Sequence, residues 1–421
     1  MLVKEVVMSG WGGMLRGRTF ALSYEGKIIE KGIPRGLGRS YGDASFCEGG
    51  YTWLMPPRRA LLKWEGSLFI AEAGMSFYEV IQKVLPQGWF PAVVPGTQFV
   101  TLGGAFASNI HGKNHHRDGS FADHVEWIEL RLPNGELRHL TPQDELFWAT
   151  AGGLGLTGII EVVALRLRRV PSSYILHEVR RARDWDELLS TLETEEIRFP
   201  YAVAWIDHTH QRNRGIIHLG RFSEKGAFRL RPSPRVGLSF TLPFSLINRF
   251  SAELIAASYW AIHKAGTRET SYADFFFPLD RVKGWNRLWG RKGFVQFHFI
   301  VPQASSLERL WSHLRNSPAR SFLTVLKRLG FQRGPLAFSG PGWSLAIDLP
   351  ASVEVGKFLI RLADMVAEEG GRIYLTKDSL LQPEQAQAMY PAWESFRQLK
   401  AYIDPEGRLR SNLSKRLRLT E

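Results

Sequence analysis

The sequence predicts an α+β fold with two domains, and three observations support this class. The chain has 421 residues with 44% hydrophobic content, which is enough to bury more than one core. Residues 1–171 combine many glycines with short β-like runs, without the regular strand and helix alternation of a doubly wound sheet. Residues 172–371 contain fewer glycines and more arginines, which indicates a second domain. From composition alone, residues 372–421 could belong to either domain.

The expected elements follow the two spacings of hydrophobic residues. Alternation predicts strands over residues 67–71, 126–132, 159–167, 202–207, 293–301, 343–349 and 373–376, with a further strand-like run at 27–29. Helical spacing predicts helices over 77–85 and 353–369, the second ending at Gly370-Gly371. Pro133-Asn134-Gly135 lies between two alternating runs and predicts a hairpin turn.

The charge of the chain favours an anionic partner. Lys and Arg number 54 against 41 Asp and Glu, which gives a formal net charge of +13. Phosphate, nucleic acid or a membrane surface would suit this charge. The single cysteine, Cys47, excludes a disulfide framework and a thiol metal cluster, and a structural role is expected for it.

The sequence contains no recognisable targeting or membrane-spanning segment. The N-terminal residues lack the apolar core of a secretory signal. The most hydrophobic region, 236–262, is broken by Pro243, Arg249 and Glu253, so no run reaches the roughly 18 to 20 apolar residues that a membrane-spanning helix needs. We therefore expect a protein that is cytoplasmic or peripheral to the inner membrane.

A basic run precedes an amphipathic stretch in the second domain. The basic residues are Arg212, Arg214, Arg221, Lys225, Arg229, Arg231 and Arg235. Residues 244–262 follow with apolar side chains at near-helical spacing. Two interpretations remain open: a solvated loop followed by a core helix, or a basic and apolar lip that rests on anionic lipid or receives a lipid-linked phosphate.

The first glycine-rich loop spans residues 34–43, with the sequence PRGLGRSYGD. Glycines let successive backbone N–H groups turn around an anion, so the loop suits a pyrophosphate cradle, although an ordinary tight turn is the alternative. Its G-x-G-x-x-x-G spacing differs from the Rossmann fingerprint, and no helical pattern follows.

Two further glycine clusters lie downstream. Residues 95–116 contain small residues that would let a flat ring approach the backbone, with Asn109, His111 and Lys113 available for its polar edge. Metal binding by His111, His115 and His116 is the alternative, but no carboxylate pattern supports it, and no metal is expected. Residues 152–158 contain G-x-G-x-x-G but precede a strand, which excludes a Rossmann turn.

These clusters, in this order and separation, resemble the PCMH-type FAD-binding domain of the vanillyl-alcohol oxidase superfamily. More narrowly, RGLGRSYGD, IHGKNHH, GSFADHV, RHLTP, ELFWATAGGLGLTGII, YLTKDS and AMYP resemble the decaprenylphosphoryl-ribose oxidases, the flavin half of a two-enzyme epimerase. The similarity runs from Ser9-Gly10-Trp11-Gly12 to the basic C-terminal tail.

The resemblance implies an FAD-binding domain over 1–171, an antiparallel-sheet substrate domain over 172–371, and a segment 372–421 that returns to the FAD domain. It implies FAD contacts at Arg35, Gly36, Leu37, Gly38, Arg39, Ser40, Tyr41, Gly42, Asp43, Gly96, Thr101, Leu102, Gly103, Gly104, Ser108, Asn109, Ile110, His111, Ile160 and Tyr374. Because Tyr41 stands where many relatives tether flavin through a histidine, FAD is expected to be non-covalent. Residues 12–33 look shortened, which predicts a lower FAD affinity.

Oxidation of a secondary alcohol needs a hydride acceptor, here flavin N5, and a group that takes the hydroxyl proton. The resemblance places Lys377 between flavin and substrate, where it could stabilise reduced flavin by its charge or, with a pKa lowered by burial, act as the base. It implies a substrate pocket of Lys113, Trp205, Gln296, His298, Lys327 and Ser344. His298, Ser344 and Ala346 replace a glutamine, an asparagine and a cysteine of the mycobacterial pattern, which leaves the exact sugar open.

The predicted function is oxidation of a secondary alcohol on a prenyl-phosphoryl sugar such as decaprenylphosphoryl-ribose. A separate NAD(P)H-dependent reductase would then complete an epimerisation for arabinan-type cell-wall precursors. The alternative enzyme is an alditol or sugar-lactone oxidase acting on free polyols, against which the pocket lysines and the basic lip argue. A nucleic-acid binder is not expected, because the basic run contains only Phe222 and Phe228 as stacking aromatics. A flavin-binding protein without catalysis is the last alternative.

Overall fold

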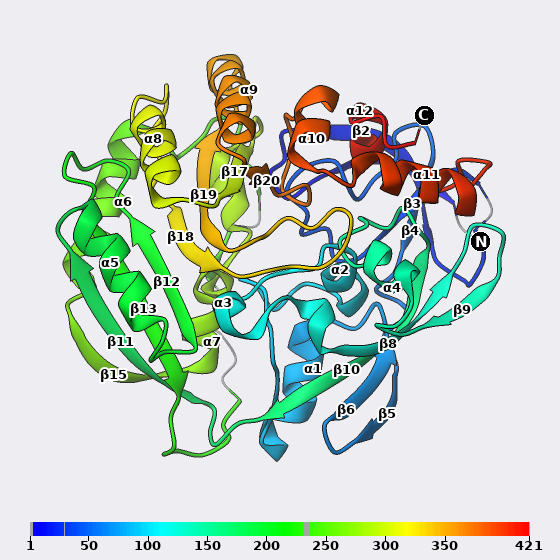
Figure 1. The fold of residues 1–421 in the computed structure, drawn as a ribbon, viewed down its shortest axis with the longest axis horizontal. Helices are drawn as coiled ribbons and strands as arrows, with labels where there is room; N and C mark the ends of the chain where they lie inside the picture. Colours follow the sequence, from blue (N-terminus) through cyan, green and yellow to red (C-terminus); the bar gives the residue numbers. More distant parts are fainter. Residues whose placement is uncertain (1–2, 29, 231–235, 239, 421) are drawn as a thin grey trace.

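Three β-sheets organise the computed structural model, which describes residues 3–28, 30–230, 236–238 and 240–420 (Figure 1). A four-stranded sheet and a six-stranded sheet are built from residues before 170, and an eight-stranded sheet from residues after 173. The mixture of helices with largely antiparallel sheets confirms the predicted α+β class.

The four-stranded sheet has the order β1-β2-β4-β3, in which β2 and β3 both run parallel to β4. Its strands are β1 (Lys4–Ser9), β2 (Arg16–Ser23), β3 (Gly32–Arg35) and β4 (Tyr51–Leu54). The strand that leads into the first glycine loop is therefore β3. The expected strand at 27–29 is wrong for residues 27 and 28, which lie in a connection, and residue 29 lies outside the described residues.

The six-stranded sheet is antiparallel, with β10 pairing to β6, β7 and β8. Its strands are β5 (Leu61–Glu65), β6 (Leu68–Glu72), β7 (Trp89–Pro91), β8 (Val125–Arg131), β9 (Leu137–Leu140) and β10 (Ile159–Arg169). The helices here are α1 (Phe77–Val84), α2 (Leu102–Ala107), α3 (His115–Asp118) and α4 (Glu145–Thr150). The predicted hairpin turn is confirmed: the N–H of Gly135, at φ +91°, donates to the Leu132 carbonyl between β8 and β9.

The eight-stranded sheet has the order β15-β11-β13-β12-β18-β19-β17-β20, and each of its neighbouring pairs is antiparallel. Its strands are β11 (Tyr174–Ala182), β12 (Tyr201–Ile206), β13 (Gly215–Phe222), β15 (Gly266–Ser271), β17 (Phe294–Val301), β18 (Thr324–Leu329), β19 (Gly342–Pro350) and β20 (Arg372–Ile373). A short parallel pair, β14 (Val236–Gly237) and β16 (Val282–Lys283), lies outside it.

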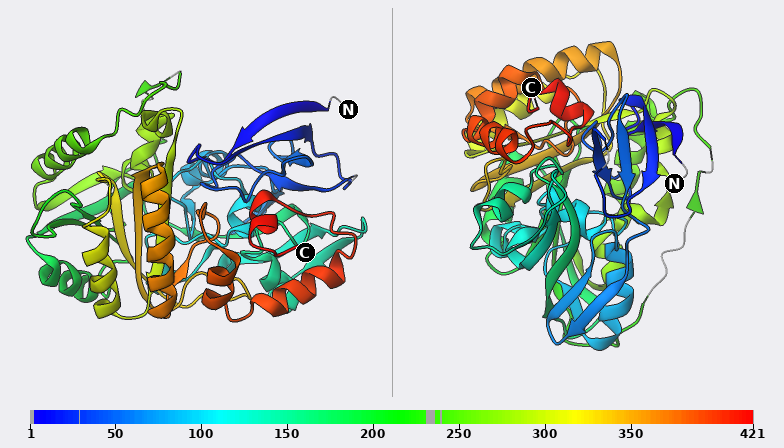
Figure 2. Two further views of the ribbon diagram at one scale, coloured as in Figure 1. Left: turned by 90° about the horizontal axis from the view of Figure 1, so that it is seen from above. Right: turned by 90° about the vertical axis from the view of Figure 1, so that its right-hand side faces the viewer.

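The two faces of this sheet have different coverings. Helices α5 (Trp185–Glu195), α8 (Ala304–Leu314) and α9 (Val353–Glu368) bury one face in the largest hydrophobic core. Helix α6 (Arg249–Ile262) lies on the other side of the sheet, where Ala256 packs against Val179, Trp205 and Ile216 (Figure 2, left). Helix α7 (Tyr272–Phe276) follows β15.

The C-terminal segment returns to the first part of the chain, and Figure 2 shows the red C-terminal helices beside the blue N-terminal strands. It contains α10 (Pro383–Met389), α11 (Trp393–Ile403) and α12 (Asn412–Arg416). The Gly32 N–H donates to the Arg408 carbonyl, and the Arg410 N–H donates to the Gly32 carbonyl. The strand expected over 373–376 is mostly wrong, because the chain turns after Ile373 and the Lys377 N–H donates to the Tyr374 carbonyl.

Among the described residues, no helix is both long and apolar enough to cross a bilayer.

Candidate active site

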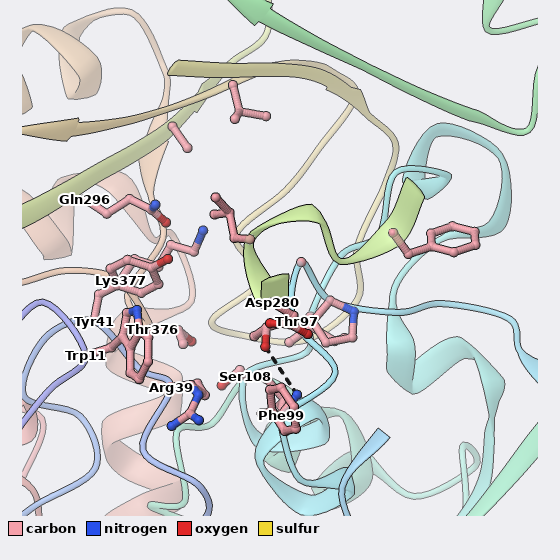
Figure 3. Close-up of a pocket in the computed structure, with 18 of the residues that line it drawn as sticks. Trp11, Arg39, Tyr41, Thr97, Phe99, Ser108, Asp280, Gln296, Thr376 and Lys377 are labelled. Atoms are coloured by element: carbon pink, nitrogen blue, oxygen red, sulfur yellow. Dashed lines mark hydrogen bonds between the residues drawn. The ribbon is translucent and has the colours of Figure 1, made fainter. Parts of the chain in front are cut away.

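A cavity of about 1030 Å³ lies where the glycine loops, the eight-stranded sheet and the C-terminal segment meet. This volume is at the upper end of the range of small-molecule sites, about 300–1,000 Å³. Figure 3 shows Trp11, Arg39 and Tyr41 together on one side, Lys377 close to Tyr41, and Thr97 and nearby residues on the other side.

The first glycine loop supplies unpaired donors to this cavity. In the described part of the chain, no acceptor meets the backbone N–H groups of residues 37–40. Gly38 has φ +64°, a conformation that favours glycine, and it lies against the Arg35 guanidinium. The Arg39 guanidinium lies 4.3 Å from the Trp11 ring centroid and donates to the Leu37 carbonyl at 2.5 Å. Successive free amides beside a cation form an anion site that suits a pyrophosphate.

The second glycine cluster forms the wall beside α2. The Thr101 hydroxyl accepts a hydrogen bond from the Gly104 N–H at 3.2 Å and caps this helix. The Tyr374 hydroxyl donates to the Ser108 carbonyl at 2.7 Å, which joins the cluster to the C-terminal segment. The His111 ring packs against those of Tyr374 and His298, with centroids 5.2 and 5.1 Å away. Burial holds the pKa of His111 well below its usual range, so its imidazole is neutral.

Both ring nitrogens of His115 in this cluster have structural partners. His115 pairs through Nε2 with Ser120 Oγ at 2.8 Å, and its Nδ1 accepts a hydrogen bond from the Gly330 N–H at 2.9 Å. In the described ranges, no group of three or more His, Cys, Asp or Glu side chains is arranged to hold a metal ion.

Most of the residues expected to contact FAD line the cavity. They are Gly36, Leu37, Gly38, Arg39, Ser40, Tyr41, Gly96, Thr101, Gly103, Gly104, Ser108, Ile110, His111, Ile160 and Tyr374. The other five expected residues, Arg35, Gly42, Asp43, Leu102 and Asn109, are not among those that line it.

Three of those five hold the first loop in place from behind. The Arg35 guanidinium donates to the Ser9 carbonyl at 2.9 Å, and Asp43 accepts from Arg416 at 2.8 Å. A Cβ at Gly42 would lie 1.7 Å from the Asp378 carbonyl oxygen, so only glycine permits this approach of the two segments.

The remaining two belong to the core around α2. Leu102 is fully buried among its hydrophobic side chains. Asn109 Oδ1 accepts from the Ala122 N–H at 3.1 Å.

One face of the eight-stranded sheet forms the other wall. Strand pairing and alternation place five expected substrate residues on this face: Trp205, Gln296, His298, Lys327 and Ser344. All five line the cavity. His298 Nε2 pairs with Ser344 Oγ at 2.7 Å, and the Trp205 Nε1–H donates to the Phe322 carbonyl at 2.8 Å.

Three lysines, Lys113, Lys327 and Lys377, line the cavity, and each is partly buried. Burial lowers the pKa of Lys327 to about 8. Burial and the charge of Lys327 together lower the pKa of both Lys113 and Lys377 to about 7. Lys377 Nζ lies 5.2 Å from the Tyr41 ring centroid, whereas Lys113 Nζ donates to the Phe275 carbonyl and lies 4.5 Å from that ring.

Sequence reasoning missed Asp348, which lies next to this group. Burial raises its pKa to about 7, although Gln296 Nε2 donates to Asp348 Oδ1 at 2.6 Å and Lys377 lies nearby. The signal was the alternation of β19, since Asp348 shares a strand face with Ser344 and Ala346. Trp11 was also missed as a wall residue.

The geometry defines a flavin-binding oxidoreductase site, and comparisons with known proteins identify the same class. Residues 30–141 match the family described as an FAD binding domain. The decaprenylphosphoryl-beta-D-ribose oxidase of Mycolicibacterium smegmatis is 34% identical over 92% of this chain and 89% of its own length. An uncharacterized Streptomyces coelicolor protein from the mprA 5′ region is 31% identical over 82% of this chain and its whole length. The chain belongs to the family of FAD-dependent oxidases that includes the mycobacterial enzyme.

The protein is therefore an FAD-dependent oxidoreductase, and the cavity fits this cofactor. The unpaired amides of residues 37–40 and the Arg39 guanidinium suit the pyrophosphate. The open space at Gly96, where an added Cβ would have no neighbour within 4 Å, leaves room beside the second cluster. When bound, FAD supplies the hydride acceptor.

Proposed function

We propose that this protein oxidises a secondary alcohol on a prenyl-phosphoryl sugar, such as decaprenylphosphoryl-ribose, to the corresponding keto sugar. The observation that carries the proposal is the presence of two lysines besides Lys377, namely Lys113 and Lys327, in one cavity. An uncharged polyol would leave the amino groups of Lys113 and Lys327 without an anionic partner, whereas a phosphoryl sugar would supply one. The name of the mycobacterial relative points to the same substrate class.

The proposed roles follow from where the side chains lie. Lys377 Nζ, with its lowered pKa, takes the proton of the reacting hydroxyl. Lys113 and Lys327 attract the phosphoryl end of the substrate. Gln296 and the His298–Ser344 pair orient the sugar hydroxyls from the sheet.

The same proposal includes a second enzyme. A keto sugar must be reduced again to complete an epimerisation, so a separate NAD(P)H-dependent reductase would consume the product and supply a precursor of arabinan-type cell-wall polymers. Adding the purified keto product and NADH to a candidate reductase would give the sugar with the inverted configuration. Recovery of the original configuration alone would exclude epimerisation.

Substrate choice is tested by anaerobic reduction of the FAD-loaded protein. A prenyl-phosphoryl pentose should bleach the flavin absorbance, whereas free alditols and sugar lactones at the same concentration should not. The reason is that the lysines contribute binding energy only to the charged substrate. Bleaching by free polyols alone would favour the alditol oxidase instead.

We expect FAD to be held without a covalent bond. Tyr41 lines the cavity as a half-buried tyrosine, and Cys47 is fully buried outside the cavity lining. Acid precipitation of the yellow protein should therefore release all flavin to the supernatant. Flavin that stays in the acid pellet, or that migrates with the protein band in denaturing gel electrophoresis, would contradict this expectation.

We also propose that α6 and the residues before it rest on an anionic membrane surface. The buried residues of α6 are Ala252 and Ala256, whereas Phe250 is 76% and Leu254 59% exposed. The exposed apolar side chains of this surface are Phe240, Phe244, Leu246, Phe250, Leu254, Ile255 and Ile262. Exposed cations border it, namely Arg249, Lys264 and Lys283. An apolar face with a basic border is typical of helices at a lipid interface.

This surface combines the two interpretations of the amphipathic stretch: α6 is a helix, but its apolar side faces solvent. Arg231 and Arg235 of the expected basic run lie outside the described residues. A Phe250→Ser, Leu254→Ser variant should bind phosphatidylglycerol vesicles about 100-fold more weakly or worse in co-sedimentation, because each side chain contributes roughly 1.5–3 kcal/mol when buried in an apolar environment and about 1.4 kcal/mol corresponds to tenfold in affinity.

The matched control is Tyr402→Ser, which removes an 85% exposed aromatic residue from α11. Vesicle binding should be unchanged in this control. Equal binding by the α6 variant and the wild type would overturn the membrane proposal.

A further inference from the structure

A second polar group lines the cavity on the outer strands of the eight-stranded sheet. His177 on β11 lies opposite Arg268 on β15, and Val179, which shares a strand face with His177, lies opposite His218 on β13. The three polar side chains therefore share the sheet face that carries Trp205 and Lys327, and all line the cavity. Sequence analysis did not single them out, because they come from three separate strands.

Hydrogen bonds connect these histidines to α6. His177 Nε2 lies 3.0 Å from His218 Nδ1, and His218 Nε2 lies 2.9 Å from the Tyr259 hydroxyl oxygen. Burial, together with the charges of Arg268 and Lys113, lowers the pKa of His177 to about 3, so the imidazole is neutral. When Tyr259 donates to His218 and His218 donates to His177, the Nδ1–H of His177 becomes a donor into the cavity.

Cations outnumber available carboxylates in this part of the cavity. Within the described ranges, no carboxylate forms an ion pair with Arg268 or Lys113. Of the carboxylates that line the same cavity, Asp274 pairs with Arg281 at 2.6 Å and Asp280 accepts from the Gln98 N–H at 2.9 Å. Two cations without an anion, beside a neutral imidazole donor, form a binding site for a phosphate group.

We propose that Lys113, His177 and Arg268 form a subsite for the phosphate of the substrate, with His218 and Tyr259 as positioning residues behind His177. The inference rests on the proposed function, which it deepens by assigning the phosphate to the outer strands and leaving the Lys377 end for the sugar. The apolar residues that line the same cavity beside Tyr259 support this assignment. Ile255 and Ile262 lie four residues before and three after Tyr259, on the same face of α6, and suit the first isoprene units.

Binding of farnesyl phosphate, inorganic phosphate and farnesol to the FAD-loaded protein, measured by calorimetry, tests the subsite. Arg268→Gln should weaken farnesyl phosphate binding by about tenfold or more, because a charge-assisted hydrogen bond is lost, and leave farnesol binding unchanged. Stronger binding of farnesyl phosphate than of inorganic phosphate is expected for a lipid-linked ligand. Stronger binding of inorganic phosphate would overturn that part of the proposal.

The matched control is Arg221→Gln. Arg221 is an exposed arginine of β13 on the opposite, helix-covered face of the same sheet, so its loss changes the net charge equally without touching the cavity. Farnesyl phosphate should bind to this control as to the wild type. An equal loss of affinity in both variants would indicate a nonspecific charge effect and overturn the subsite.

A second readout comes from NMR of protein labelled with ¹⁵N-histidine. Farnesyl phosphate should shift the ring nitrogens of His177 and His218 and raise the pKa of His177, because a nearby anion favours the imidazolium. In His177→Asn, the His218 signal should lose its response.

Two outcomes separate the subsite from the proposed function. If Arg268→Gln leaves both the affinity and these shifts unchanged while the prenyl-phosphoryl sugar is still oxidised, the subsite is wrong and the proposed function stands. If the sugar is not oxidised but the shifts depend on Arg268, the proposed function is wrong and the anion site stands.

Discussion

Lys377→Met should slow anaerobic flavin reduction by a prenyl-phosphoryl pentose at least about 100-fold, the lower end of the contribution of a general base. Methionine keeps much of the volume of lysine but cannot accept the hydroxyl proton. Stopped-flow absorbance of the FAD-loaded variant measures the rate, and a normal flavin spectrum shows that the cofactor is still bound. Reduction at the wild-type rate would remove Lys377 from the mechanism.

The pH dependence identifies which role Lys377 has. A base requires the neutral amine, and burial lowers the pKa of Lys377 to about 7. The wild-type reduction rate should therefore rise as the pH rises through about 7 and level off above it. A rate that falls over the same range would mean that the ammonium acts instead, by stabilising negative charge. Lys357→Met on the exposed part of α9 is the control, and its profile should match the wild type.

Arg416→Leu should reduce the free energy of unfolding by about 3–5 kcal/mol, because it leaves two buried carboxylates without their cation. The Arg416 guanidinium lies 2.8 Å from Asp43 and 2.9 Å from Asp378, and both carboxylates are about 5% exposed or less. Burial already raises the pKa of Asp43 above its usual value. In the variant the ionised form of Asp43 costs still more, so the loss should shrink as the pH falls and the Asp43 carboxyl group takes up a proton.

Thermal and urea unfolding at two pH values would measure this effect. Adding Asp43→Asn and Asp378→Asn to Arg416→Leu should recover part of the stability, because no buried charge remains. Arg138→Leu removes an exposed ion pair with Glu136 and should cost at most about 1 kcal/mol. An equal loss of unfolding free energy in the Arg416 and Arg138 variants would show that the buried Arg416, Asp43 and Asp378 triad stabilises the fold no more than an exposed ion pair does.

Local patterns predicted much of the fold. Alternation located β6, β8, β10, β12, β17 and β19 to within a few residues, because each strand buries one or both faces in a core. Helices α1 and α9 were predicted well, since both are amphipathic and begin at a serine cap. The strand expected at 373–376 failed because its apolar residues line a turn rather than extend the sheet.

The site was harder to predict from spacing alone. The glycine loops were visible as anion cradles, since their function depends on local backbone conformation. Lys113, Lys327 and Lys377 were recognised only by resemblance, because three distant segments bring them together and lysine on a sequence gives no sign of burial. Arg268 and His177 remained hidden for the same reason: strand pairing, rather than sequence distance, makes them neighbours.

The contact between Gly42 and Asp378 has a consequence for biosynthesis. The Tyr41 N–H donates to the Thr376 carbonyl, and Arg416 connects Asp43 with Asp378, so the first loop is fixed by residues that are made after α9. A nascent chain that has emerged only as far as α9 possesses both glycine clusters but lacks the segment that closes on them. We therefore expect a ribosome-bound polypeptide of this length to remain colourless, with cofactor loading only after the segment that follows α9 has emerged.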